Sequence, residues 1–174
     1  MFARMLFSVL ATGIFSTASA AGDQYVDGSG YAVSGYDVVA YFDLAQSTVG
    51  TSQPKGIPGR ADLTTKYNDA KFAFSTQANL DRFLAGPAEF APQYDGHCAY
   101  GVAQGGKVPG NPNLWRIVDG KLYLNITKGV ARDWEQDIPG YVEQAGAEWA
   151  DGLERERASR DRIPQFSSAA PIAN

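Results

Sequence analysis

A short hairpin is the feature of this sequence that most narrows the folds open to it. Residues 115–124 read Trp-Arg-Ile-Val-Asp-Gly-Lys-Leu-Tyr-Leu, with Asp-Gly at the centre. Asp-Gly is a favoured two-residue hairpin loop because both of its positions adopt positive φ. A loop here pairs Ile117 with Leu122 and Trp115 with Leu124 on one face, so the loop and the apolar pattern agree on a single register. The sequence therefore predicts an antiparallel hairpin at 115–124.

Helical and strand patterns lie on both sides of this hairpin. Ser75 and Thr76 can cap a helix that follows a strand-like segment at 70–74. Thr127 precedes another helical pattern, and Pro139 separates that pattern from a third, whose charges continue at helical spacing to Arg162. Residues 45–62 are rich in Gln, Ser, Thr, Gly and Pro and indicate an exposed loop. The expected fold class is α+β: a small antiparallel β-sheet packed by helices near 77–84, 128–138 and 140–162.

The first twenty residues predict a cleaved secretory signal. Arg4 gives a positive start, an apolar run follows, and Ala18-Ser19-Ala20 suits a signal peptidase. We therefore expect a periplasmic or secreted protein, cut near Ala20, with no membrane span after the cut. The domain organisation expected is a signal peptide at 1–20, a polar lead-in at 21–34, a folded domain at 35–153, and a solvated helix end with a flexible tail at 154–174.

Charge and cysteine usage limit the partners and the chemistry. The formal net charge is −4 and no basic tract occurs, which argues against a nucleic-acid partner. The chain has one cysteine, Cys98, so no internal disulfide can form and stability must come from packing. Its one histidine is the neighbouring His97. A lone thiol in an oxidising compartment is either buried and inert or retained for a function.

A family resemblance rests on segments spread over roughly residues 30–150. Phe72-Ala-Phe-Ser-Thr76, Phe83-Leu-Ala-Gly-Pro87 and Phe90-Ala-Pro-Gln-Tyr94 resemble the YHS domain, a small module often attached to metal-handling proteins. With residues 35–42 upstream and Gly96-His-Cys-Ala-Tyr-Gly-Val-Ala103 downstream, the chain resembles the exported, single-domain branch of that family. Some members of this branch have selenocysteine in a similar Gly-x-x-Ala-Tyr-Gly context. The resemblance thus implies chemistry at Cys98.

The chain departs from the metal-binding members of the family. Those modules carry cysteines in a Phe-Cys-Ser-x-x-Cys arrangement, and the matching positions here are Ser75 and Asn79. Neither residue supplies a thiolate for a soft metal, so the family's usual metal site does not transfer to this chain. A new site at Cys98 and His97 would need further ligands, for example the carboxylates of Asp37 or Asp95, or a second chain. Without such a site, Asp37 is expected to be buried and to hold backbone amides.

Two functions remain open at this point, and the sequence does not decide whether the protein is an enzyme. In the first, it is a metal-associated or thiol-redox protein that acts through Cys98 and His97. Its cofactor would be a copper or zinc ion, or its catalytic group would be a Cys98 thiolate of depressed pKa. In the second, it is a non-catalytic ligand- or protein-binding module. Cys98 is then buried core, and a groove lined by Tyr94, Tyr100 and Trp115 takes the ligand. A monomer or weak dimer is expected in either case.

Overall fold

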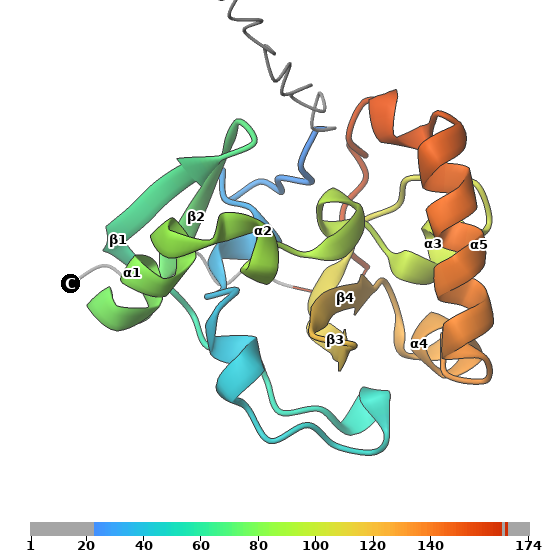
Figure 1. Cartoon of the computed structure of the whole chain (residues 1–174), viewed down its shortest axis with the longest axis horizontal. Helices are drawn as coiled ribbons and strands as arrows, with labels where there is room; N and C mark the ends of the chain where they lie inside the picture. Colours follow the sequence, from blue (N-terminus) through green and yellow to red (C-terminus); the bar gives the residue numbers. More distant parts are fainter. Residues whose placement is uncertain (1–22, 165, 167–174) are drawn as a thin grey trace, which may run out of the picture.

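The computed structural model describes residues 23–164 and 166 and has the predicted α+β fold (Figure 1). The predicted signal at 1–20 and most of the predicted tail lie outside these residues. The regular elements in chain order are β1 (Arg60–Tyr67), β2 (Ala70–Phe74), α1 (Gln77–Ala85), α2 (Pro87–Phe90), α3 (Ala99–Ala103), β3 (Asn111–Val118), β4 (Lys121–Asn125), α4 (Lys128–Trp134) and α5 (Ile138–Asp151). Single 3-10 turns stand at Val33–Gly35, Ala40–Asp43, Gly50–Ser52, Gln93–Gly96 and Leu153–Arg155.

The predicted hairpin is confirmed with its register. Strands β3 and β4 are antiparallel, and Trp115 pairs with Leu124 and Ile117 with Leu122. Asp119 and Gly120 form the loop with φ of 49° and 70°. The Asp-Gly loop has thus placed the apolar side chains on one face of the hairpin, as expected.

The β-structure is more extensive than the sequence indicated. β1 and β2 form a second antiparallel hairpin, separate from the first, so there are two small sheets and not one. The predicted strand at 70–74 is β2, whereas β1 was missed and begins inside the segment expected to be loop. β1 is mostly polar and only partly buried along its length, and such a strand lacks the alternation that would reveal it.

The main core lies between the two hairpins. It joins aromatic side chains of β2 and α1 to the apolar face of β3–β4, and the segment 32–41 fills the space between them. Figure 1 shows the β1–β2 hairpin with α1 on one side of the molecule, α5 on the other, and β3–β4 between them. The largest fully buried side chains of this core are Trp115, Tyr41, Phe72, Phe74, Phe83, Leu122 and Leu124.

The opposite face of β3–β4 is also covered. Tyr123 on that face is 4% exposed and packs against the buried Trp134 of α4, with ring centroids 5.7 Å apart. Helix α3 lies between this face and α5, where Val102 and Ala103 contact Ala145. Tertiary packing thus buries the hairpin on both sides, and α3, which begins directly after Cys98, is held in this second layer.

The two C-terminal helices are shorter than predicted. α4 ends at Trp134, because Asp137 caps a new helix by accepting a hydrogen bond from the Gly140 N–H, and Pro139 fits the first turn of that helix. α5 ends at Asp151, since Gly152 follows with φ of 145°. The prediction of a helix to Arg162 is therefore wrong: charges at helical spacing did not outweigh a glycine stop.

Residues 156–164 instead run back along the body of the protein without regular structure. Ile163 is 7% exposed, and the Tyr25 hydroxyl donates a hydrogen bond to the Asp161 carbonyl at 3.1 Å. The N-terminal residues beside this segment are packed as well, with Tyr25 and Val33 both 3% exposed or less. Among the described residues, no helix is long and apolar enough to cross a membrane.

Gly110 offers a test of the close packing between the turn at Gly96 and β4. A Cβ at Gly110 would meet the Gly96 carbonyl oxygen and lie 2.8 Å from the Leu124 Cβ. We expect Gly110→Ala to lower the free energy of unfolding by about 1–3 kcal/mol, measured by urea denaturation. The control Gly146→Ala, in α5 where the added methyl meets nothing within 4 Å, should raise it by about 0.5–1 kcal/mol. Equal effects of the two changes would contradict this packing.

Candidate functional site

Cys98 lies at the start of α3 and is 0% exposed. It forms a parallel bridge with Leu124 of β4, and its own N–H donates to the Val108 carbonyl at 2.9 Å. The Sγ atom donates to Asn125 Oδ1 at 3.4 Å and accepts from the Gly101 N–H at 3.4 Å. The thiol thus acts as the N-cap of α3 and has no contact with solvent.

The protonation of Cys98 follows from this burial. Loss of solvent raises the pKa of the thiol above its ordinary value, and hydrogen bonds from the backbone lower it by less. The thiol is therefore the stable form at neutral pH. A nucleophilic or metal-ligating cysteine needs the opposite, a depressed pKa and an accessible sulfur, so the structure does not provide the conditions expected of a reactive thiolate.

His97 is also 0% exposed, and internal hydrogen bonds occupy both of its ring nitrogens. Nδ1 lies 2.9 Å from the Tyr94 carbonyl oxygen, so it carries the proton, and Nε2 accepts from the Ser159 N–H at 3.1 Å. Burial lowers the pKa of His97 to about 4, which keeps the ring neutral. His97 thereby fastens the segment 156–164 to the turn that precedes Cys98.

The His97–Cys98 pair does not fit a copper or zinc ion. The one unprotonated nitrogen of His97 is taken by Ser159, and the sulfur of Cys98 is enclosed by α3 and Asn125. Within residues 23–164 and at 166, no group of three or more His, Cys, Asp or Glu side chains is placed to hold a metal ion. A zinc site requires four ligands and a catalytic one at least three from the protein.

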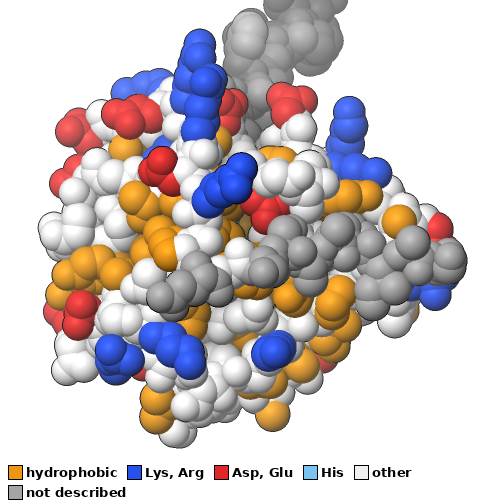
Figure 2. Space-filling view, turned by 180° about the vertical axis from the view of Figure 1, so that it is seen from behind, with side chains coloured by type: hydrophobic (Ala, Val, Ile, Leu, Met, Phe, Trp, Pro, Cys, Tyr) orange, Lys and Arg blue, Asp and Glu red, His pale blue; other side chains and the backbone are white. Residues whose placement is uncertain are grey.

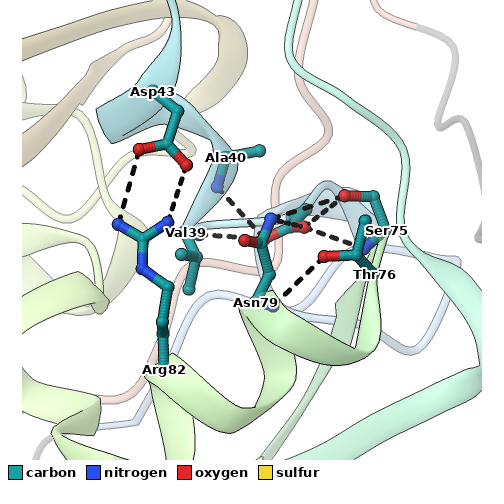
Figure 3. A network of polar contacts seen from close by, with 8 residues as sticks. Val39, Ala40, Asp43, Ser75, Thr76, Asn79 and Arg82 are labelled. Carbon is teal, nitrogen blue, oxygen red and sulfur yellow. Dashed lines mark hydrogen bonds and ion pairs between the residues drawn. The ribbon is translucent and has the colours of Figure 1, made fainter.

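Asp37 is 0% exposed, as predicted, and accepts hydrogen bonds from four residues. Figure 3 labels these four donors, Val39, Ala40, Ser75 and Asn79. Its Oδ1 accepts from the N–H groups of Val39 at 2.9 Å and Ala40 at 3.2 Å. Its Oδ2 accepts from the Ser75 N–H at 2.8 Å, the Ser75 Oγ at 2.6 Å and the Asn79 Nδ2 at 2.7 Å. One fully buried carboxylate thus ties the turn at residues 37–40 to the end of β2 and the start of α1.

Ser75 and Asn79 occupy the positions at which metal-binding members of the resembled family have cysteines. In this chain both side chains donate to Asp37, so they satisfy a buried carboxylate. Five donors already occupy that carboxylate, which leaves it unsuited to a cation. The prediction that Asp37 accepts hydrogen bonds from backbone amides is confirmed. Asp37 therefore has a structural role.

The three aromatic residues expected to share a groove lie apart. Trp115 is 1% exposed, and its Nε1 donates to the Pro54 carbonyl at 2.8 Å. Tyr94 packs between Tyr123 and Trp149, and Tyr100 packs against Tyr141 with ring centroids 5.0 Å apart. Trp115 belongs to the main core, whereas Tyr94 and Tyr100 both pack against the cluster of Ala99, Tyr123 and Trp134. None of the three lines the cavities described below.

A second polar cluster adjoins the C-terminal segment. Gln24 Nε2 donates to Asp95 Oδ1 at 2.7 Å, whereas Asp95 Oδ2 and Gln24 Oε1 are buried with no hydrogen-bond partner among the described residues. Burial raises the pKa of Asp95 to about 6, an effect that Glu154 and Asp23 increase and Lys107 opposes. The Lys107 Nζ is held by the Glu154 and Glu156 carbonyls at 3.0 and 2.6 Å.

A cavity of about 670 Å³ lies beside the start of β3. Its walls come from Tyr36, the loop before β1, the start of β3, the start of α4 and Phe166. The lining is polar and apolar in similar measure, and the volume lies in the range of small-molecule sites, about 300–1,000 Å³. Sequence reasoning missed this site, because its residues lie in segments far apart in the chain, and no short motif unites them.

Comparison of the chain with protein-family models, with curated proteins and with solved structures gave no match.

The role of Asp37 can be tested against a nearby exposed carboxylate. Removing Asp37 leaves the buried N–H groups of Val39 and Ala40 and the part-buried donors of Ser75 and Asn79 without this acceptor, so Asp37→Ala should lower the free energy of unfolding by about 3–5 kcal/mol. The control Asp43→Ala removes the ion pair with Arg82, 2.6 Å long and partly exposed (Figure 3), and should cost less than about 1 kcal/mol. Chemical denaturation measures both, and similar losses would refute the Asp37 network.

Asp95 gives a pH-dependent prediction. Its pKa in the folded protein, about 6, lies above that of an unfolded aspartate, so its contribution to stability is present at low pH and is lost as the pH rises toward and through 6. Asp95→Asn keeps an acceptor for Gln24 and removes the buried charge. We expect this variant to raise the free energy of unfolding by about 1 kcal/mol at pH 7 and by little near pH 4. The effect at pH 7 is modest because solvent still reaches part of Asp95.

The control for this experiment is Asp133→Asn, which removes an exposed charge on α4. It should change the free energy of unfolding by less than about 0.5 kcal/mol at either pH. If Asp95→Asn raises the free energy of unfolding by the same amount at pH 4 and pH 7, ionisation of Asp95 does not contribute to the change in stability.

Proposed function

We propose that the protein is an exported, non-catalytic binding module of YHS-like type, in which Cys98 belongs to the core and a small ligand occupies the 670 Å³ cavity. The resemblance and the signal-like residues 1–20 motivate the family and the location, in the periplasm or outside the cell. The observation that carries the functional part is the complete burial of both Cys98 and His97. A substrate or metal ion cannot reach Cys98 or His97, because their polar atoms contact only other parts of the protein.

The hydrogen bonds of the pair support this proposal independently of burial. The Cys98 sulfur bonds to Asn125 and Gly101, and the His97 ring bonds to Tyr94 and Ser159. Their partners differ, so the two side chains perform separate structural tasks although they are adjacent in sequence. A metal-associated or thiol-redox role would require both to be released from these partners.

Thiol labelling of the purified protein tests the proposal. We expect native Cys98 to react with iodoacetamide or a disulfide reagent at least about 100-fold more slowly than an exposed thiol, because reaction requires transient opening. The matched control is Ser52→Cys in a Cys98→Ala background, which places the thiol on an exposed turn. In denaturant both thiols should react at the same rate.

Metal analysis of the same preparation completes the test. The proposal expects no stoichiometric copper or zinc, and no change in melting temperature of the protein when either ion is added. Labelling of native Cys98 at the rate of the control, or one ion per chain that is lost in Cys98→Ala, would establish the metal-associated or thiol-redox role instead.

A further inference from the structure

The charge of the 670 Å³ cavity distinguishes it from two other cavities formed by the described residues. Its lining holds Lys55 and Lys128 and no aspartate or glutamate, although the chain as a whole has a net charge of −4. The cavities of about 290 and 530 Å³ beside residues 157–163 each mix aspartate with arginine. Only the largest of the three thus has a single sign of charge.

The two lysines are available to a ligand. Both are exposed, and neither forms an ion pair or side-chain hydrogen bond with any residue in the part of the chain that the structure describes. They come from different segments, Lys55 from the loop before β1 and Lys128 from the first turn of α4. Two lysine side chains in one cleft attract an anion, and the low-dielectric wall of the cleft strengthens that attraction.

Two asparagines add oriented donors to the same cavity. Asn111 is 9% exposed, and its Oδ1 accepts from the Asn113 N–H at 2.9 Å. Asn113 Oδ1 in turn accepts from the Gly56 N–H at 3.2 Å. Each amide oxygen already accepts a backbone hydrogen bond, whereas no hydrogen bond to a described residue is formed by either NH₂ group, and an NH₂ group can only donate. Donors suit a carboxylate or phosphate oxygen.

The remaining wall is apolar. The rings of Tyr36 and Phe166 pack in a tilted arrangement with centroids 6.1 Å apart, and Leu114 and Ile126 also line the cavity. Such a wall fits the hydrocarbon body of a ligand, while the lysines and amides fit its charged end. On the face of the protein that Figure 2 shows, lysine and arginine side chains are scattered, and several lie beside aspartate or glutamate, so this face has no continuous basic patch for an extended polyanion.

We propose that this cavity binds a small organic anion, in which one carboxylate or phosphate group is attached to an apolar, ring-sized body. Lys55 and Lys128 attract the charged group, the NH₂ groups of Asn111 and Asn113 hydrogen-bond it, and Tyr36, Leu114 and Phe166 cover the body. This inference rests on the proposed function as a binding module and names the class of its ligand.

Isothermal titration calorimetry with matched probes tests the inference. The anions are phenylacetate, indole-3-acetate and phenyl phosphate, and the neutral counterparts are phenylacetamide, indole-3-acetamide and phenol. We expect at least one anion to bind at least tenfold more tightly than its counterpart, and its affinity to fall as salt rises from 20 to 300 mM, about as expected from Debye screening. Preference for phenyl phosphate over the acetates would identify a phosphate group, and the reverse a carboxylate.

Variants locate the site. Lys55→Gln and Lys128→Gln should each weaken binding of the anion about fivefold, whereas Lys121→Gln, an exposed lysine at the hairpin loop, should leave it unchanged. Since all three lysines are exposed, these variants should fold as the wild type does. Amide NMR shifts on titration should concentrate at Asn111, Leu114 and Gly129, which line the cavity.

The results separate this inference from the proposed function. Equal affinity for anions and neutral counterparts, shifts confined to residues 157–163, or no binding of any probe at millimolar concentration would overturn the anion-binding inference. Native reactivity of Cys98 would overturn the proposed function whichever probes bind.

Discussion

The buried carboxylate of Asp37 is the interaction on which the arrangement of this fold depends. It accepts hydrogen bonds from the turn at residues 37–40, from the end of β2 and from α1, and these three segments form one side of the main core. Leaving such donors unpaired in the core is costly, so a single side chain fixes where the aromatic residues of β2 and α1 meet the β3–β4 hairpin. A chain without disulfides can obtain from such a network the fixed geometry that a crosslink would otherwise supply.

Local signals predicted those parts of the fold that local interactions decide. The Asp119-Gly120 loop specified its register because turn geometry and apolar alternation are both short-range, and the Thr76 cap placed the start of α1 for the same reason. Strand β1 and the end of α5 were not predicted. β1 depends on its pairing with β2 more than on its own pattern, and Gly152 ended a helix that its charges would have continued.

The candidate site illustrates why adjacency in sequence is a poor guide to a shared role. Successive residues in extended chain direct their side chains to opposite sides, and His97 and Cys98 accordingly meet different partners, Ser159 and Asn125. Burial then moves their pKa values apart, lowering that of the imidazole and raising that of the thiol. The cavity shows the converse: its lysines and asparagines lie far apart in the chain, and only the fold brings them together.

Both facts bear on the export that we propose from the signal-like residues 1–20. A thiol in an oxidising compartment is vulnerable unless solvent is kept from it, and Cys98, the N-cap of α3, is fully buried and bonded to Asn125 and to the Gly101 N–H. The cavity does hold accessible polar groups, because lysines without ion-pair partners among the described residues line it together with two asparagines. The packing that encloses the sulfur leaves the lysines of the cavity accessible, and this contrast supports the proposed binding role over a reaction at Cys98.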